Sequence, residues 1–345
     1  MEEEMTIIQN QNIETMKSII YGSIFGLVVG DALGVPHEFK SRSLFDKNPV
    51  TGMDSYGTYN QPAGTWSDDS SLTLATLDSL SKGLDYYDMM DKFTSWYTED
   101  KYTPFDKVFD IGNATLNAIL NYISSKDPML SGLTDEHSNG NGSLMRMLPG
   151  ALFISYKTLE EYKNIDDKLN IIHNISALTH KHPRSILSCG IYSFIVYYIL
   201  KNKEENNSES LESLVNKGIE VAKQYYSKET EEFIEFKKEL HHFENIFSLE
   251  TKNLDKNQIK GSGYVLNSLE ASIWCLLNTN CYSDAVLEAV NLGEDTDTTA
   301  AIVGSLAGLY YEYDNIPKEW LNTIVKKEYI ENITNNFIES LIINK

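Results

Sequence analysis

The sequence is poor in cysteine, with three in 345 residues, and it contains no CxxC pair. Cys189, Cys275 and Cys281 are too few and too scattered for a disulfide framework or a zinc ribbon. We therefore expect all three to pack in the core. The acidic N-terminus leads into no apolar run of the signal-peptide type. Together these features predict a cytoplasmic protein from a reducing compartment.

Long apolar runs and positive charge are also scarce. The most apolar stretch near the N-terminus, 19–29, is shorter than the roughly 20 residues of a membrane span and is soon followed by Asp31. The formal net charge is −21, a sign that repels phosphate backbones. We expect neither a membrane nor duplex nucleic acid as a partner. A small anionic ligand stays compatible, because one pocket can gather cations and helix N-termini.

The chain has eight prolines, which leave long segments uninterrupted, and it has few alternating strand patterns. Apolar residues recur mostly at the period of a helix. The sequence therefore predicts an all-α protein. Helices are expected near residues 12–33, 68–82, 88–98, 107–124, 142–156, 165–178, 183–202, 208–226, 229–246, 262–279, 282–291, 297–312 and 317–341.

No repeat of fixed period and no linker divide the chain. The length alone would suit two domains, but the absence of a linker favours one compact multi-helix domain over 1–345, acting as a monomer. Residues 201–260 are rich in Lys, Glu and Asn and are expected to form a helical elaboration on this domain. The polar stretches 156–167 and 201–212 are expected to be surface connections.

Several glycines are spaced four residues apart, in a pattern that differs from the GxGxxG of dinucleotide-binding loops. On a helix, this spacing produces a smooth stripe that a second helix can approach closely. We therefore predict tight helix packing at two sets of glycines. The sets are Gly22, Gly26, Gly30 and Gly34, and Gly304 with Gly308.

The strongest chemical signal is a pair of similar acidic turns, 64–70 and 293–299, each followed by an apolar helix. Helix capping alone explains one oxygen-bearing side chain per turn, whereas each turn here offers three or more. If the turns converge, their four carboxylates would repel one another unless cations intervene. Oxygen ligands select hard ions, so we expect two Mg²⁺ or Mn²⁺ ions about 3.5–4 Å apart. The candidate metal ligands are Ser67, Asp68, Asp69, Asp295, Asp297 and Thr298.

Other polar residues allow a functional and a purely structural interpretation. Glu38 is either a general acid/base or a surface carboxylate, and Asp110 precedes a helix that it could simply cap. The glycine-rich segment 139–143 can present backbone N–H groups to a diphosphate, or it can be an ordinary turn. His180, taken alone, is more simply explained as a loop histidine whose ring nitrogens find hydrogen-bond partners within the protein. Tyr264 can stack on a base, although tyrosine is common in this chain.

The order of these motifs resembles the ADP-ribosylglycohydrolase family, which includes the dinitrogenase reductase-activating glycohydrolases. The resemblance extends from about residue 19 to about residue 320, and the number of motifs in order makes it specific. The motifs are Gly30-Asp31 through Glu38, Ser67-Asp68-Asp69, Asn141-Gly142-Ser143 with Arg146, Thr179-His180, Gly263-Tyr264-Val265 and Asp295-Thr296-Asp297-Thr298.

The resemblance implies an all-α fold around a two-metal site, and it assigns roles to the matching residues. The two acidic turns are implied to hold the metals from opposite sides, Glu38 to take part in catalysis or gate the site, and Asp110 to lie by the distal ribose. The implied substrate-binding residues are Asn141, Gly142, Ser143, His180 and Tyr264. The sequence departs from the family pattern at Ser67, where threonine is frequent, and at Glu294, where glycine is usual.

The resemblance also implies an activity: hydrolysis of the glycosidic bond between ADP-ribose and a modified arginine or serine side chain, or a related conjugate. The expected partner is ADP-ribose or an ADP-ribosylated protein. A catalytically silent ADP-ribose-binding or structural protein of the same fold is the alternative. Two other enzyme classes fit poorly, because the chain has no His-Asp dipeptide of a helical phosphohydrolase and no second arm of a DDxxD motif after Asp68-Asp69.

Overall fold

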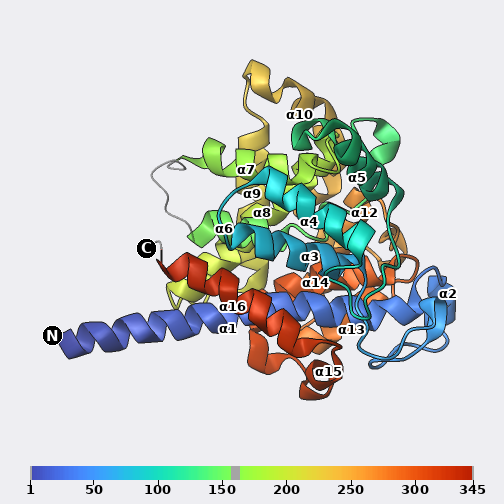
Figure 1. Ribbon diagram of the computed structural model, residues 1–345, viewed down its shortest axis with the longest axis horizontal. Coiled ribbons are helices and arrows are strands. Elements are labelled where there is room, and N and C mark those ends of the chain that lie inside the picture. Colours follow the sequence, from blue (N-terminus) through green and yellow to red (C-terminus); the bar gives the residue numbers. More distant parts are fainter. Residues whose placement is uncertain (1, 157–163, 344–345) are drawn as a thin grey trace.

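The computed structural model describes residues 2–156 and 164–343, so part of the predicted 156–167 connection, 157–163, lies outside the described residues. The described chain consists of α-helices joined by loops and short 3₁₀ turns, without a β-strand (Figure 1). This confirms the all-α prediction. The helices are α1 (Glu2–Gly34), α2 (Arg42–Phe45), α3 (Asp68–Leu80), α4 (Tyr86–Glu99), α5 (Asn113–Ser125), α6 (Leu148–Tyr156), α7 (Ile165–Ala177), α8 (Pro183–Glu204), α9 (Leu211–Tyr226), α10 (Ile234–Glu239), α11 (Glu244–Phe247), α12 (Val265–Leu277), α13 (Tyr282–Val290), α14 (Thr296–Tyr311), α15 (Lys318–Thr323) and α16 (Lys327–Ile343).

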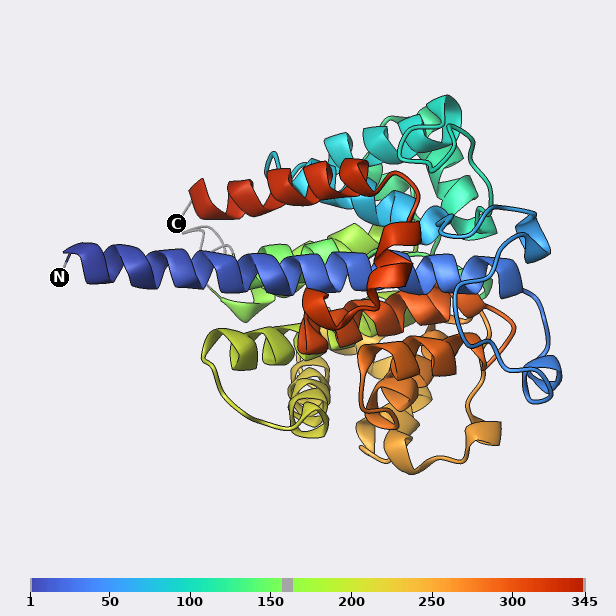
Figure 2. The ribbon, with the colours of Figure 1, turned by 90° about the horizontal axis from the view of Figure 1, so that it is seen from below.

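The first helix, α1, runs through the middle of the molecule. It lies between a layer that contains α16 and a layer that contains α13 and α14 (Figure 2). The most extensive contact of α1 is with α14, and the stripe of glycines brings the two backbones together. A Cβ atom on Gly26 would lie 2.2 Å from the Gly304 carbonyl oxygen, and one on Gly30 would lie 2.1 Å from that of Ala300. No side chain fits at such distances, so the predicted tight helix packing is confirmed.

The close approach continues to the functional end of both helices. A Cβ atom on Gly34 would lie 2.2 Å from the Cα atom of Asp297, and the Thr296 hydroxyl donates a 2.8 Å hydrogen bond to the Gly34 carbonyl. The C-terminus of α1 and the N-terminus of α14 are therefore fixed against each other. This contact determines where Asp31, on the last turns of α1, lies relative to Asp297.

Several helices differ from the sequence-based bounds. The helix predicted from 107 begins at Asn113, because Asp110 adopts a left-handed φ of 52° and Gly112 is the N-cap. The helix predicted from 142 begins at Leu148, after a series of turns. The segment 229–246 is not one helix but a succession of 3₁₀ turns with α10 between them. The segment 317–341 is broken into α15 and α16, and Lys326 at the break has a φ of 54°.

One hydrophobic core runs through the whole described chain, as expected for a single domain. Residues 201–260 contribute to it: α9 packs on α8, and Tyr226 and Phe243 from this region are fully buried. Two helical segments, Ile13–His37 and Pro183–Glu204, are long and apolar enough to cross a bilayer. Their apolar windows are 89% and 83% buried inside the protein, which is how core helices of a folded domain behave.

Candidate metal and substrate site

The two acidic turns converge. The first turn of α3 and the first turn of α14 meet at a hydrogen bond of 3.3 Å from the Thr298 hydroxyl to the Asp69 carboxylate. Each acidic turn begins with a glycine in the left-handed region, Gly64 with a φ of 80° and Gly293 with a φ of 78°. Ser67 is the N-cap of α3, and its hydroxyl also donates to Asp69 at 3.2 Å. The structure therefore brings the six predicted metal ligands into one region.

A fifth carboxylate, that of Asp31 on α1, supports this region at the start of α3. It is fully buried and accepts hydrogen bonds from the Ser67 and Ser70 backbone N–H groups at 2.9–3.0 Å and from the Ser70 hydroxyl at 2.5 Å. Burial raises the pKa of Asp31 to about 6. The sequence analysis assigned Asp31 no role, although one available signal was an ionisable residue inside an otherwise apolar helix.

The carboxylates form two overlapping groups that share Asp297. Ligand atoms of Asp31, Asp69 and Asp297 lie within 4.8 Å of one another, and so do those of Glu38, Asp110 and Asp297. Burial, followed by repulsion between neighbouring carboxylates, raises the pKa values of Asp69 and Asp297 well above the usual range. Both pKa shifts reflect burial and then repulsion between ionised carboxylates, and a bound cation would relieve that repulsion.

Unpaired oxygens give an independent indication of the same need. The buried atoms Asp69 Oδ1, Asp297 Oδ2 and Glu38 Oε2 accept no hydrogen bond from the described residues, and Asp295 Oδ1 is likewise without a donor. Buried carboxylate oxygens are normally paired or coordinate metals. An all-oxygen donor set of this kind suits a hard divalent cation better than zinc, whose protein sites are built mainly from Cys and His.

Glu38 and Asp110 reach this centre from two loops. Glu38 follows α1 and is 5% exposed, while Asp110 lies in the loop before α5. Burial, with a further contribution from the Asp110 charge, raises the pKa of Glu38 to about 9. Tyr59 hydrogen-bonds with Glu38 and packs its ring 5.2 Å from that of Phe109. Sequence reasoning missed Tyr59, because nothing in the motif around it marks it among 21 tyrosines.

A cavity of about 360 Å³ opens over the carboxylates. Its wall is completed by the loop 139–142, which pairs with 263–265 through hydrogen bonds from the Asn141 N–H to the Gly263 carbonyl and from the Val265 N–H to the Asn139 carbonyl, both 3.0 Å. The Asn141 amide also donates to the Asp295 carboxylate at 2.9 Å. The predicted site residues that line the cavity are Glu38, Asp68, Asp110, Asn141, Gly142, His180, Asp295 and Thr298.

Two predicted substrate-binding residues lie elsewhere. Ser143 is fully buried, where it accepts a hydrogen bond from Ser176 at 2.9 Å and contacts Cys189 at 3.5 Å, and it does not line the cavity. The backbone of Tyr264 lies beside Gly140 of the loop, but the residue lines a separate polar cavity of about 360 Å³. Arg184, at the start of α8, donates a 3.0 Å hydrogen bond to the Tyr264 hydroxyl. Neither residue is thus in direct contact with the space above the carboxylates.

The unusual Glu294 has a backbone explanation. Its φ is 63°, a conformation that glycine adopts without strain, and its backbone exchanges hydrogen bonds with Phe39 and Lys40 at 2.6 and 2.7 Å. Its side chain is exposed. A glycine would fit this left-handed backbone without strain, and the glutamate side chain here lies outside the carboxylate cluster.

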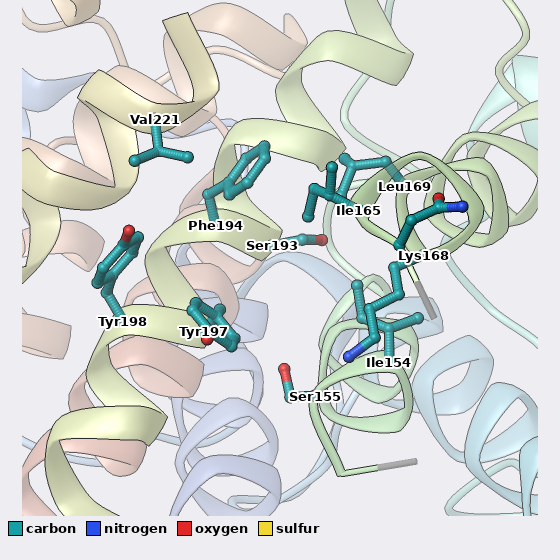
Figure 3. Close-up of a pocket in the computed structure, with 11 residues that line it drawn as sticks. Ile154, Ser155, Ile165, Lys168, Leu169, Ser193, Phe194, Tyr197, Tyr198 and Val221 are labelled. Atoms are coloured by element: carbon teal, nitrogen blue, oxygen red, sulfur yellow. The ribbon is translucent and has the colours of Figure 1, made fainter. Parts of the chain in front are cut away.

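A second cavity, of about 320 Å³, lies between α6, α7, α8 and α9 (Figure 3). Phe194, Tyr197 and Tyr198 of α8 face Lys168 and Leu169 of α7 across it. Among the described residues, no carboxylate, histidine or cysteine lines it. The described residues of this cavity thus offer no cluster of metal-binding side chains, and the carboxylate site is the better candidate for catalysis.

Comparison with known proteins identifies the class to which this fold and site belong. The chain belongs to the ADP-ribosylglycohydrolase family, whose sequence profile matches residues 12–343. It is similar to an ADP-ribosylarginine hydrolase of Serratia proteamaculans, with 31% identity over 90% of this chain and 76% of that protein. It is also similar to an ADP-ribosyl-[dinitrogen reductase] glycohydrolase of Rhodospirillum rubrum, with 26% identity over 89% and 90% of the two chains. A solved structure described as an ADP-ribosylglycohydrolase-related protein complex matches with a TM-score of 0.73 and 25% identity, over 95% of this chain and 99% of that one.

Proposed function

We propose that this protein hydrolyses the glycosidic bond between ADP-ribose and the side chain of a modified arginine in a protein. The observation that carries the proposal is the convergence of two buried acidic turns beneath a cavity whose wall is a glycine-rich loop. The arginine linkage is supported by the similarity to the ADP-ribosylarginine hydrolase. A serine linkage is the competing choice within the same reaction class.

Two Mg²⁺ or Mn²⁺ ions are part of the proposal. Asp31, Asp69 and Asp297 would hold one ion, and Glu38, Asp110 and Asp297 offer oxygens around a second position. Asp31 also accepts hydrogen bonds from the backbone at the start of α3. It would therefore bind the ion through one oxygen only, or influence it indirectly through neighbouring ligands. When bound, such ions supply positive charge that orients oxygen ligands and stabilises negative charge at the reacting centre.

The chain's own groups account for the remaining steps. Hydrolysis breaks the bond between the anomeric carbon and the guanidine nitrogen, adds the hydroxyl of water to that carbon and leaves a proton on the nitrogen. Glu38 is positioned to hold and transfer this proton, since its buried carboxyl lines the cavity beside the carboxylate cluster. Asp110 lies within reach of the same centre and would orient the ribose. The backbone of Asn141 and Gly142 would face the diphosphate.

The direct test is release of ADP-ribose from arginine-modified and serine-modified peptides, each with Mg²⁺, with Mn²⁺ and with EDTA. Metal-dependent release from the arginine peptide alone supports the proposal in full. Release from the serine peptide would correct the linkage. Absence of release from both, with ADP-ribose still binding by calorimetry, would replace the hydrolase by the catalytically silent binding protein.

A further inference from the structure

Arg146 is an unusual cation. It precedes α6, its side chain is 0% exposed, and it forms no ion pair among the described residues. Its guanidinium lies 4.7 Å from the centroid of the Phe93 ring, and its Nε and one terminal nitrogen have no hydrogen-bond acceptor. Burying an unpaired charge is costly. Arg146 therefore lowers the stability of the fold, and its few hydrogen bonds are the place to look for a function.

The other terminal nitrogen makes two contacts. It donates to the Ile175 carbonyl at 3.1 Å and to the Thr179 hydroxyl oxygen at 2.8 Å. The same Thr179 oxygen lies 2.8 Å from Nδ1 of His180. These three side chains form a continuous path from the buried cation to a histidine that lines the cavity above the carboxylates.

The direction of the hydrogen bonds follows from counting protons. Arg146 only donates, so the Thr179 oxygen accepts from it. The single Thr179 proton then points to His180 Nδ1, since no other acceptor for it is found among the described residues. Nδ1 accepts that proton through its lone pair in this arrangement, whereas an Nδ1–H that donated to Thr179 would leave the Thr179 proton without an acceptor. The neutral imidazole therefore carries its own proton on Nε2.

The Nε2 edge of His180 is the part of the ring that faces the glycine-rich loop. A Cβ atom on Gly140 would lie 3.6 Å from Nε2, and one on Gly142 would lie 3.3 Å from it. Nε2 has no hydrogen-bond partner within the described part of the chain. Burial, followed by the charge of Arg146, lowers the pKa of His180 to about 3, so the ring is neutral near pH 7. Its one N–H group is thus directed at the cavity.

We propose that Arg146 is a positioning residue that acts through Thr179 to fix the Nε2–H tautomer of His180, which donates a hydrogen bond to an oxygen of the bound ADP-ribose. The ionised diphosphate oxygens of ADP-ribose only accept hydrogen bonds, so a histidine with a lone pair at Nε2 would repel them. The identity of the ligand rests on the proposed function. The tautomer and its cause do not, because they follow from contacts inside the protein.

The first experiment reads the tautomer directly, by ¹⁵N NMR of histidine-labelled full-length protein in Mg²⁺ at neutral pH, with His180→Gln to assign the signal. The expected result is a protonated Nε2 and an unprotonated Nδ1. Thr179→Val removes the linking hydroxyl and should shift His180 towards the Nδ1–H form or a mixture. Thr179→Ser keeps the hydroxyl and should preserve the wild-type signal. An Nδ1–H signal in the wild type, or an unchanged signal in Thr179→Val, would overturn the proposal.

The second experiment measures ADP-ribose affinity of the same variants by calorimetry. We expect Thr179→Val to bind about three- to tenfold more weakly, the loss of one hydrogen bond, and Thr179→Ser to bind as the wild type does. Equal affinity of Thr179→Val, despite a changed tautomer, would overturn the contact with the ligand. If the wild type binds no ADP-ribose, the proposed function fails together with that contact, whereas the NMR result still decides whether the Thr179 hydroxyl sets the tautomer.

Discussion

Thr298 donates a hydrogen bond to the carboxylate of Asp69 across 3.3 Å, although 229 residues separate the two in the sequence. The contact joins the first turns of α14 and α3 and makes one oxygen-rich centre from two helix starts. Each turn by itself resembles an ordinary helix cap. It is their meeting, enforced by the glycine contact between α1 and α14, that leaves more buried carboxylates together than helix capping can explain.

Asp297 belongs to both carboxylate groups, so replacing it should have opposite effects on activity and on stability. Asp297→Asn should lower metal affinity by at least about tenfold and abolish metal-dependent ADP-ribose release. Without metal it should raise the melting temperature, because it removes a buried charge whose pKa is raised by burial and by its neighbours. Differential scanning calorimetry in EDTA measures the effect on stability, and ADP-ribose release in Mg²⁺ measures the effect on activity.

A matched control for this variant is Glu232→Gln, which removes one negative charge at an exposed position far along the chain. It should leave activity and melting temperature almost unchanged. If Asp297→Asn retains full metal-dependent activity, Asp297 is not a ligand, and the overlap of the two carboxylate groups has no catalytic meaning.

Asp31→Asn should behave differently from Asp297→Asn. Asp31 accepts hydrogen bonds from three donors at the start of α3, and an amide would present an NH₂ group to some of them. We expect a loss of about 1–3 kcal/mol of unfolding free energy even in EDTA, which urea titration measures. An increase in metal-free stability would instead show that Asp31 acts mainly as another repelling charge.

The stability of the metal-free protein should depend on pH in an unusual direction. Folding raises the pKa of Asp31 to about 6 and that of Glu38 to about 9, so the folded state binds more protons than the unfolded state between about pH 4 and 9. Their stabilising contribution is complete below pH 4 and is lost as pH rises through the folded pKa values. Melting temperatures in EDTA should fall over this window, and Glu38→Gln should flatten its upper part. Saturating Mg²⁺ should remove the fall, since it compensates the ionised carboxylates.

Glu294→Gly should stabilise the protein. The residue has a φ of 63°, and a left-handed conformation costs a residue with a side chain about 1–2 kcal/mol. Glycine avoids this cost, but part of the gain in stability is lost because glycine makes the unfolded chain more flexible. The expected gain is about 0.5–1 kcal/mol by chemical denaturation. Glu294→Ala is the control, because alanine keeps the strain and should give no gain. Equal effects of the two variants would assign the change to the lost carboxylate.

The sequence predicted the helical class, the glycine contact and the two acidic turns, because each depends on a local pattern. It did not predict Asp31 as a support of α3, since that role requires α1 and α3 to be packed together. It placed helix starts too early at 107 and 142, where Asp110 and the turns before Leu148 depart from helical backbone to shape the cavity. Local propensity does not reveal such departures, because tertiary contacts determine them.

Tyr264 gives a test of how the adenine end is bound. Its hydroxyl is held by Arg184, whose guanidinium also bonds Glu239 at 2.8 Å and His242 at 2.9 Å, so the ring is fixed beside a polar cavity next to the site. If the ring stacks on the base, Tyr264→Ala should raise KM for the modified peptide about two- to tenfold and leave kcat nearly unchanged, because stacking contributes equally before and during bond cleavage. Tyr264→Phe keeps the ring and loses only the hydroxyl, so it should raise KM far less. A KM raised equally by both variants would mean that the Arg184 contact matters and the ring face does not, and an unchanged KM in Tyr264→Ala would place the adenine elsewhere.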